Sequence, residues 1–232
     1  MAKEKVWLAW SAGKDAGEAL RRERERGEVE VTRLLVTVTQ DYDRVSMHGV
    51  REELVRAQAV ALGLPLRVVR IPSECSNEDY EAAMAAAMEA ARGEGVSAVA
   101  FGDIFLEDVR EYRERQLSRA GMGARFPLWG EDTASLAREM IESGVEAYVT
   151  CLDPRKVPPE LAGCRFDERL LGDLPADCDP CGENGEFHTF LANAPTFSRR
   201  VAVEVGETVG RGGFVFTDVV AAAGDSQALS ES

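Results

Sequence analysis

The sequence lacks the features of membrane and secreted proteins. None of its apolar runs approaches the ~20 residues that a helix needs to span a bilayer. The first residues, 1–5, have neither the apolar core nor the small-residue cleavage site of a signal peptide. Five cysteines, an odd number, do not indicate a disulfide framework. We therefore expect a cytoplasmic protein without a membrane partner.

A basic surface for binding a long polyanion is also missing. The net charge is −14, with 27 Lys and Arg against 41 Asp and Glu. The arginines between 21 and 26 alternate with glutamates, as on a solvated helix face with i,i+4 ion pairs. Nucleic acid is therefore not an expected partner. A small anion such as ATP, which a local site can hold, remains compatible with this charge.

Histidine is scarce, and it limits the metal sites that the chain can form. His48 and His188 are the only two histidines. Cys178 and Cys181 form a CxxC pair upstream of His188, which gives three soft ligands where a structural zinc site needs four. The pair does not open a helix after a strand, as a thioredoxin-like motif does. We expect Cys181 to be structural, and whether the pair has any redox or metal role stays open.

Apolar β-branched segments alternate with helical patterns along the first half of the chain. This pattern predicts an α/β fold with a Rossmann-like parallel sheet. Residues 1–126 are expected to form a domain that binds ATP, 127–222 a smaller α+β lobe, and 223–232 a disordered tail. The expected strands are 6–10, 32–39, 66–71, 97–101 and 147–151, with an antiparallel pair at 201–205 and 214–220. The expected helices are 14–26, 50–62, 77–93 with Asn77 as its cap, 106–120 and 133–143.

The segment from Trp7 to Ala16 is the most informative part of the chain. An apolar strand ends in small residues and Lys14, and a helical pattern follows. Unpaired N–H groups at a helix start bind phosphate, and small residues let the anion approach the backbone. The segment is not a Walker A loop, because Asp15 stands where that motif has Ser or Thr. The carboxyl ends of the neighbouring strands, at Thr37 and Gly102, are the next places to expect ligand contacts.

Residues 11–16, Ser-Ala-Gly-Lys-Asp-Ala, resemble the pyrophosphate loop of the N-type ATP pyrophosphatases, usually Ser-Gly-Gly-Lys-Asp-Ser. Ala12 replaces a glycine, a mild change if its φ is negative. Ala16 replaces a serine, which removes a hydroxyl that could contact phosphate or metal-bound water.

Four further segments narrow the resemblance to one branch of these pyrophosphatases. Residues 179–190 would by themselves be read as a solvated surface turn. However, 182–190, Gly-Glu-Asn-Gly-Glu-Phe-His-Thr-Phe, resemble the C-terminal signature of the diphthine–ammonia ligase family, a branch of these pyrophosphatases. Residues 102–104, with Glu107, Tyr112 and Arg113, match its central motif, and 127–130 match the segment that follows. Residues 47–50 resemble the variant of bacterial members. The motifs occur in the family's order.

The resemblance implies an ATP-dependent ligase that cleaves ATP to AMP and pyrophosphate through an adenylated intermediate, which ammonia or an amine then attacks. The residues implied in catalysis are Lys14, Asp15, Asp103, Glu183, Glu186 and His188. Those implied in ATP binding are Ser11, Ala12, Gly13, Lys14, Asp15, Ala16, Thr37, Met47, His48 and Gly102. Asn184, Gly185 and Glu186 would contact the acceptor, and Asp15 and Asp103 would bind Mg²⁺. Asp15 could instead pair within the loop.

Two alternatives stay open. Ala16 is compatible with a nucleotide-binding module that has little catalytic activity. A tRNA-modifying pyrophosphatase is a third reading, which the acidic charge disfavours. The acceptor, a small molecule or a protein residue such as diphthine, is not determined, and a homodimer is expected on general grounds alone.

Overall fold

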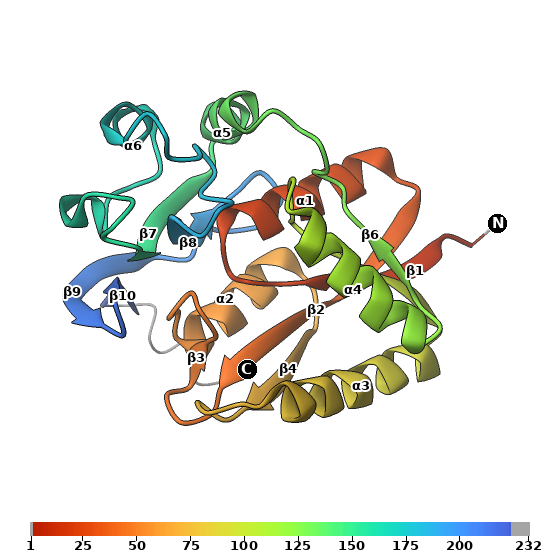
Figure 1. The fold of residues 1–232 in the computed structure, drawn as a ribbon. Coiled ribbons are helices and arrows are strands. Elements are labelled where there is room, and N and C mark those ends of the chain that lie inside the picture. Colours follow the sequence, from red (N-terminus) through yellow and green to blue (C-terminus); the bar gives the residue numbers. More distant parts are fainter. Residues whose placement is uncertain (1, 224–232) are drawn as a thin grey trace.

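The computed structural model describes residues 2–223, which form two sheets with helices around them (Figure 1). The first is a six-stranded sheet: β1 (Glu4–Ala9), β2 (Val29–Thr39), β3 (Arg44–Val45), β4 (Leu66–Ile71), β5 (Val96–Ala100) and β6 (Gly123–Arg125). β1 lies between β2 and β5, β4 pairs with β2, and β6 pairs with β5, all in parallel. The short β3 is antiparallel to β2. The predicted Rossmann-like α/β fold is confirmed.

Helices cover both faces of this sheet: α1 (Lys14–Arg26), α2 (Glu52–Leu62), α3 (Asn77–Gly93) and α4 (Glu107–Arg119). Alternate residues of β1 point to opposite faces. Leu8 packs in one core with Leu20 of α1 and Leu54 of α2. Trp7 packs in the other with Met88 of α3 and Leu117 of α4. β1, β2 and β5 are parallel, so their carboxyl ends lie together at one edge of the sheet, between these two helical layers.

The second sheet is antiparallel and has the order β8-β7-β10-β9. Its strands are β7 (Glu146–Leu152), β8 (Phe187–Asn193), β9 (Val203–Arg211) and β10 (Phe214–Ala221), accompanied by α5 (Thr133–Glu142), the 3₁₀ turn η1 (Pro159–Leu161) and α6 (Glu168–Asp173). The predicted antiparallel pair is present. β9 runs further than predicted, so that a short turn at Gly212 and Gly213 connects it to β10.

Two local predictions were wrong. Ser76, and not Asn77, caps α3, because its hydroxyl accepts a hydrogen bond of 3.1 Å from the Asp79 N–H. The predicted loop at 179–190 ends earlier, since β8 begins at Phe187 and pairs with β7. The tail expected at 223–232 lies outside the described residues except for its first position.

The two sheets share one hydrophobic core. Leu8 and Leu34 of the parallel sheet belong to the same buried cluster as Phe166 and Phe190 of the second lobe. α1 packs closely on β8, since a Cβ added at Gly17 would lie 2.3 Å from Leu191 Cδ2. The division into residues 1–126 and 127–222 stays a prediction. Within residues 2–223, no helix is long and apolar enough to cross a membrane.

Candidate functional site

The 11–16 loop connects β1 to α1 and is held in place by the second lobe. The Ala12 carbonyl accepts hydrogen bonds from the backbone N–H of Leu191, at 2.8 Å, and from Gln58 Nε2, at 3.1 Å. Gln58 also donates to the Leu191 carbonyl at 2.6 Å and accepts from Trp10 Nε1 at 2.8 Å. Sequence reasoning missed Gln58, because it looks like one polar residue in an amphipathic helix. In the structure it is fully buried and ties the loop, α2 and β8 together.

Ala12 has a φ of +68°, in the left-handed region. The loss of glycine at this position is mild only if φ is negative, and the structure does not meet that condition. A residue with a Cβ in this conformation costs roughly 1–2 kcal/mol relative to the right-handed region. The two hydrogen bonds to its carbonyl hold this strained backbone in place.

The N-terminus of α1 carries no side-chain cap. Its N-cap residue is Gly13, and α2 and α4 also lack a side-chain cap, whereas hydroxyl or carboxylate side chains cap α3, α5 and α6. The Lys14 N–H donates to Thr189 Oγ1 at 3.2 Å, and the Gly13 N–H donates to Ser11 Oγ at 3.3 Å. An uncapped helix start directs its remaining amides and its dipole toward an anion. The anion site that the sequence predicts at this helix start stays a prediction.

Lys14 is buried instead of reaching into open solvent. Its side chain is 1% exposed, and its Nζ lies 2.9 Å from both carboxylate oxygens of Asp15 and 2.5 Å from the Cys181 carbonyl oxygen. The rings of Phe166 and Phe187 lie 5.2 and 5.3 Å from the ammonium. Burial acts to lower the pKa of Lys14, but the charge and hydrogen bonds of Asp15, together with contributions from Cys181 and Glu183, raise that pKa, so that the amine stays charged.

The 179–186 loop, which contains Cys181, is built around Asp179. Its carboxylate accepts from the N–H groups of Cys181 at 2.9 Å and Glu183 at 3.1 Å, and from the Thr133 hydroxyl at 2.6 Å. Gly185 has a φ of +77°, a conformation that glycine adopts without strain. The loop therefore presents the Cys181 carbonyl to Lys14 from a fixed position.

The central motif meets this loop at Glu183. Asp103, after β5, accepts from Arg113 of α4 at 2.5 and 3.1 Å. Glu183 accepts from the Ile104 N–H at 2.7 Å. Burial, with a further contribution from the charges of Asp15 and Asp103, raises the pKa of Glu183 to about 7. Sequence reasoning missed the partner role of Arg113.

The predicted Mg²⁺ ligands are already engaged by cations. Asp15 pairs with Lys14, the alternative left open above, and Asp103 pairs with Arg113. Among residues 2–223 there is no group of three or more His, Cys, Asp or Glu that could hold a metal ion. The carboxylates do not fit a Mg²⁺ site as they lie here.

Gly102, predicted to contact ATP, lies against the protein itself. A Cβ at this position would come within 2.9–3.0 Å of the backbone of Asp15 and Ala16. Glycine is therefore required for the end of β5 to approach the first turn of α1. This contact brings the central motif next to the 11–16 loop.

The two histidines lie together beside the 11–16 loop. The ring centroids of His48 and His188 are 4.5 Å apart, and His48 Nδ1 lies 3.4 Å from the Thr189 carbonyl. Burial lowers the pKa of His188 to about 4 and lowers that of His48 well below its ordinary value. Lys14 acts in the same direction on both. Both imidazoles are thus neutral at physiological pH.

Glu186 faces inward from the end of the 179–186 loop. It is 3% exposed, and its Oε1 accepts from the Asp179 N–H and from Asn184 Nδ2, each at 3.2 Å. Its Oε2 has no hydrogen-bond partner among the described residues.

Both cysteines of the CxxC pair are free. Burial raises the pKa of Cys178 to about 12 and that of Cys181 further, so both stay protonated thiols.

Met47 lines a separate cleft of about 730 Å³, between the β2–β3 connection and the β9–β10 hairpin. Gly49, Phe214 and Phe216 also line it. His48, between Met47 and Gly49, lies instead against the 11–16 loop, since its Cε1 would be 3.2 Å from a Cβ at Gly13. Thr37 does not line the cleft. Of the predicted nucleotide-binding residues, Met47 therefore lines the cleft and His48 lies at the loop, whereas Thr37 of β2 is at neither.

Comparison with known proteins shows the family of this chain. Residues 4–124 match the family model of the diphthamide synthase N-terminal domain, and residues 132–220 match that of its C-terminal domain. The chain belongs to the diphthamide synthase family. Among curated proteins, the diphthine–ammonia ligases of rat and human are 26% and 25% identical over 181 residues, which cover 72% of this chain and 67% of each relative. The bovine diphthine–ammonia ligase is 25% identical over 191 residues, 77% of this chain and 70% of that protein.

The strain at Ala12 gives the first prediction. We expect Ala12→Gly to raise the free energy of unfolding by about 1 kcal/mol, because glycine adopts a positive φ at no steric cost. The matched variant Ala16→Gly, inside α1, should lower it by roughly 0.5–1 kcal/mol. Urea unfolding of both variants measures the difference. Equal destabilisation by the two glycines would contradict the assigned backbone strain.

The raised pKa of Glu183 gives the second prediction. An acid whose pKa rises from its ordinary 4.5 to about 7 on folding holds a proton more tightly in the folded state, so its contribution to stability falls between these pH values. Glu183→Gln keeps the acceptor oxygen for Ile104 but cannot ionise. We expect the melting temperature of this variant, relative to the wild type, to increase from pH 5 to pH 8. A difference that does not change with pH would show that Glu183 titrates normally.

Proposed function

We propose that this protein is an ATP-dependent C–N ligase that cleaves ATP between its α and β phosphates. The observation that carries the proposal is the meeting of the uncapped α1 N-terminus with the 179–186 loop, through Lys14 and Cys181. Membership of a family whose curated relatives are named diphthine–ammonia ligases supports it. The predicted cytoplasmic location and dimeric state stay predictions.

In this proposal the first turn of α1 binds the pyrophosphate portion of ATP. Preorganised backbone donors and a charged lysine stabilise negative charge that develops on a leaving group. The Lys14 ammonium already donates its hydrogen bonds to Asp15 and to the Cys181 carbonyl. In this proposal Lys14 therefore stabilises the phosphates through its positive charge and holds the 179–186 loop in place, without a direct hydrogen bond to them. The proposed steps rest on these residues, and none is assigned to Mg²⁺.

Proton transfer is the proposed task of Glu183. Its pKa of about 7 allows it to accept a proton from an attacking amine and to release it at neutral pH. The neutral imidazole of His188 is a second acceptor close to Lys14. Glu186 and Asn184 would orient the amine or the acceptor from the same loop, Glu186 with its unpartnered oxygen.

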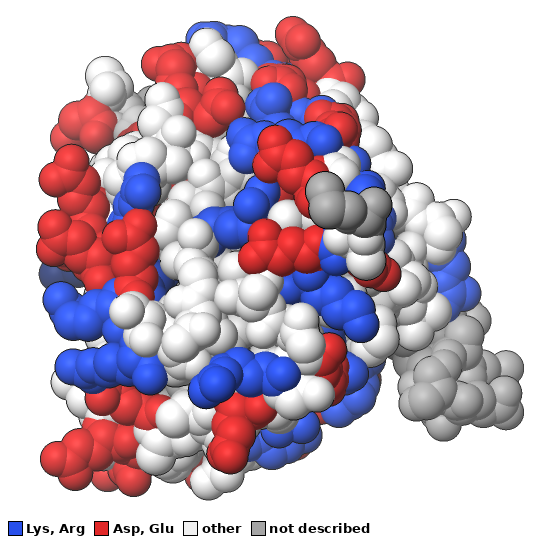
Figure 2. All heavy atoms as spheres, turned by 90° about the vertical axis from the view of Figure 1, so that its right-hand side faces the viewer, with Lys and Arg blue, Asp and Glu red and all other residues white. Residues whose placement is uncertain are grey.

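We propose that the cleft lined by Met47 and Gly49, on either side of His48, admits the acceptor. The acceptor's reacting group would have to extend beyond the cleft to reach Glu183 and Glu186, which do not line it. The cleft volume of about 730 Å³ suits a small molecule or a projecting side chain, so both kinds of acceptor are retained. The net charge of −14 disfavours a nucleic-acid acceptor. On the one face drawn in Figure 2, basic and acidic side chains are intermixed.

The alternative of a nucleotide-binding module has one observation in its favour. Ala16 lies in the first turn of α1, where the usual serine would add a hydroxyl next to the bound anion. In that case Ala16→Ser would raise turnover by roughly 10²-fold or more, the loss typical for one missing transition-state donor.

The direct test is product analysis with α-labelled ATP, Mg²⁺ and ammonium. A cell extract, separated by ultrafiltration into small-molecule and protein fractions, supplies the acceptor. We expect AMP to appear with one of the fractions, and Lys14→Met to reduce its rate by roughly 10²–10³-fold. Glu183→Gln, which keeps its hydrogen bond to Ile104, should reduce it by roughly 10²–10⁴-fold.

The exposed Lys3 provides the matched control, and Lys3→Met should leave the rate unchanged. Melting temperatures of all variants separate loss of chemistry from loss of fold. ADP as the sole product would contradict α–β cleavage. ATP binding without AMP, restored to turnover by Ala16→Ser, would favour the binding module.

A further inference from the structure

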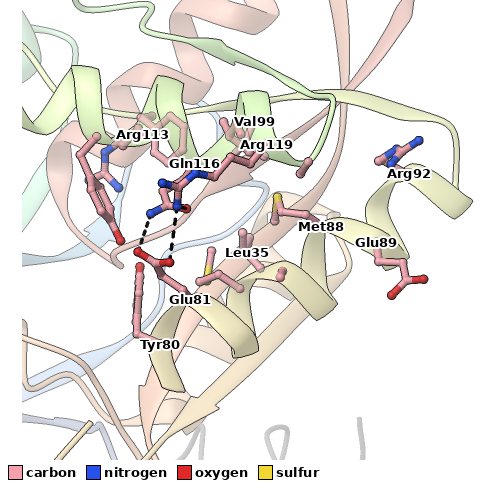
Figure 3. Close-up of a pocket in the computed structure, with 16 residues that line it drawn as sticks. Leu35, Tyr80, Glu81, Met88, Glu89, Arg92, Val99, Arg113, Gln116 and Arg119 are labelled. Atoms are coloured by element: carbon pink, nitrogen blue, oxygen red, sulfur yellow. Dashed lines mark hydrogen bonds and ion pairs between the residues drawn. The ribbon is translucent and has the colours of Figure 1, made fainter. Parts of the chain in front are cut away.

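A groove of about 430 Å³ lies between α3 and α4, on the face of the parallel sheet opposite α1 and α2 (Figure 3). Leu35 of β2 and Val99 of β5 contribute to its lining, together with Tyr80, Met84 and Met88 of α3 and Tyr112 of α4. None of the residues predicted to bind ATP or acceptor lines it. The groove is therefore separate from the proposed active site.

The helices that border the groove are poorly packed. Of the 13 residues of α4 only Leu117 is buried, and of the 17 residues of α3 only Ala87, Met88 and Ala91. The small side chains of the alanine-rich α3 do not fill the space above the sheet. Burial of apolar surface is the main source of helix docking energy, so an apolar molecule in this groove would supply contacts that the chain itself lacks.

A polar bridge crosses the groove between the two helices. Glu81 of α3 accepts a hydrogen bond of 2.7 Å from Gln116 and lies 3.6 Å from an Arg119 nitrogen, both on α4 (Figure 3). Arg92 and Arg113 also line the groove, but Arg113 is paired with Asp103, so that Arg92 and Arg119 face Glu81 and Glu89. An anionic group would therefore be held where Arg119 and Gln116 already hold the Glu81 carboxylate, by taking its place.

We propose that this groove is a second binding site, which takes a small aromatic molecule with one anionic group. The rings of Tyr80 and Tyr112 supply faces for stacking, and Met84 and Met88 adapt to a ligand's shape. The anionic group replaces the Glu81 carboxylate beside Arg119 and Gln116. The volume is in the range of sites for drug-sized ligands.

An occupant of the groove would contact a residue that serves the active site. Arg113 lines the groove, and its guanidinium holds the Asp103 carboxylate and lies 4.4 Å from the Phe101 ring. Phe101 directly precedes Gly102, which packs against the 11–16 loop. The site therefore has a direct structural connection to the central motif.

The probe for the test is 8-anilinonaphthalene-1-sulfonate, an aromatic anion that fluoresces in apolar sites, titrated into the full-length protein. Ala85 lines the groove, while the neighbouring exposed Ala86 does not. We expect Ala85→Trp to weaken probe binding at least tenfold, and the matched variant Ala86→Trp to change it less than twofold. Saturating ATP should not displace the probe.

A second pair of variants acts in the opposite direction. Glu81→Ala removes the carboxylate that competes for Arg119 and should tighten probe binding severalfold, whereas Glu78→Ala, on the exposed first turn of α3, should not. Unchanged affinity in both Ala85→Trp and Glu81→Ala would overturn the proposal. Competitive displacement by ATP would place the groove in the nucleotide site and would also overturn it.

Discussion

The burial of the Lys14 ammonium is the constraint on which the site depends. Removing a charge from water is costly unless it is paired and hydrogen-bonded, and removing one partner of a buried pair is strongly destabilising. Asp15 supplies the opposite charge from the adjacent position, but the Cys181 carbonyl comes from the other lobe, 167 residues away. The 11–16 loop can therefore hold Lys14 in this way only while the 179–186 loop lies over it.

Other contacts follow from this one. β8 leaves the 179–186 loop next to the start of α1, where Thr189 accepts from the Lys14 N–H and Leu191 donates to Ala12. Gln58 of α2 donates hydrogen bonds to the carbonyls of both Ala12 and Leu191. These bonds hold Ala12 at a positive φ, which alanine rarely adopts. The lobes are thus joined at the loop where the anion is proposed to bind, and a change at either loop is expected to affect the other.

The parallel sheet and its helices could be predicted from the sequence because they depend on local patterns. Val6 to Trp10 and 32–39 have the apolar and β-branched residues of buried strands, and Gly63 followed by Pro65 ends a helix wherever it packs. The motif residues were predicted through family resemblance, since no spacing rule brings residues 11–16, 102–103 and 179–186 together. The structure shows that Gly102 packs against the first turn of α1. It also shows that Glu183 accepts a hydrogen bond from Ile104, in the segment after β5.

What could not be predicted depends on long-range pairing. The φ of Ala12, the burial of Gln58 and the ion pair of Arg113 with Asp103 follow from neighbours far apart in the chain. β8 was missed because its residues, Phe187 to Asn193, overlap a motif rich in polar groups and become a strand only by pairing with β7. The cap of α3 was predicted one residue too late, at Asn77 instead of Ser76, and helix ends are commonly uncertain by one residue.

A crystal structure with α,β-methylene-ATP, which resists cleavage between the α and β phosphates, would test the central claim most directly. The account predicts phosphate oxygens about 2.7–3.2 Å from the free amides in the first turn of α1, with Lys14 still bonded to Asp15 and the Cys181 carbonyl. Phosphates bound away from that turn, or a 179–186 loop that leaves Lys14 when the nucleotide binds, would contradict it.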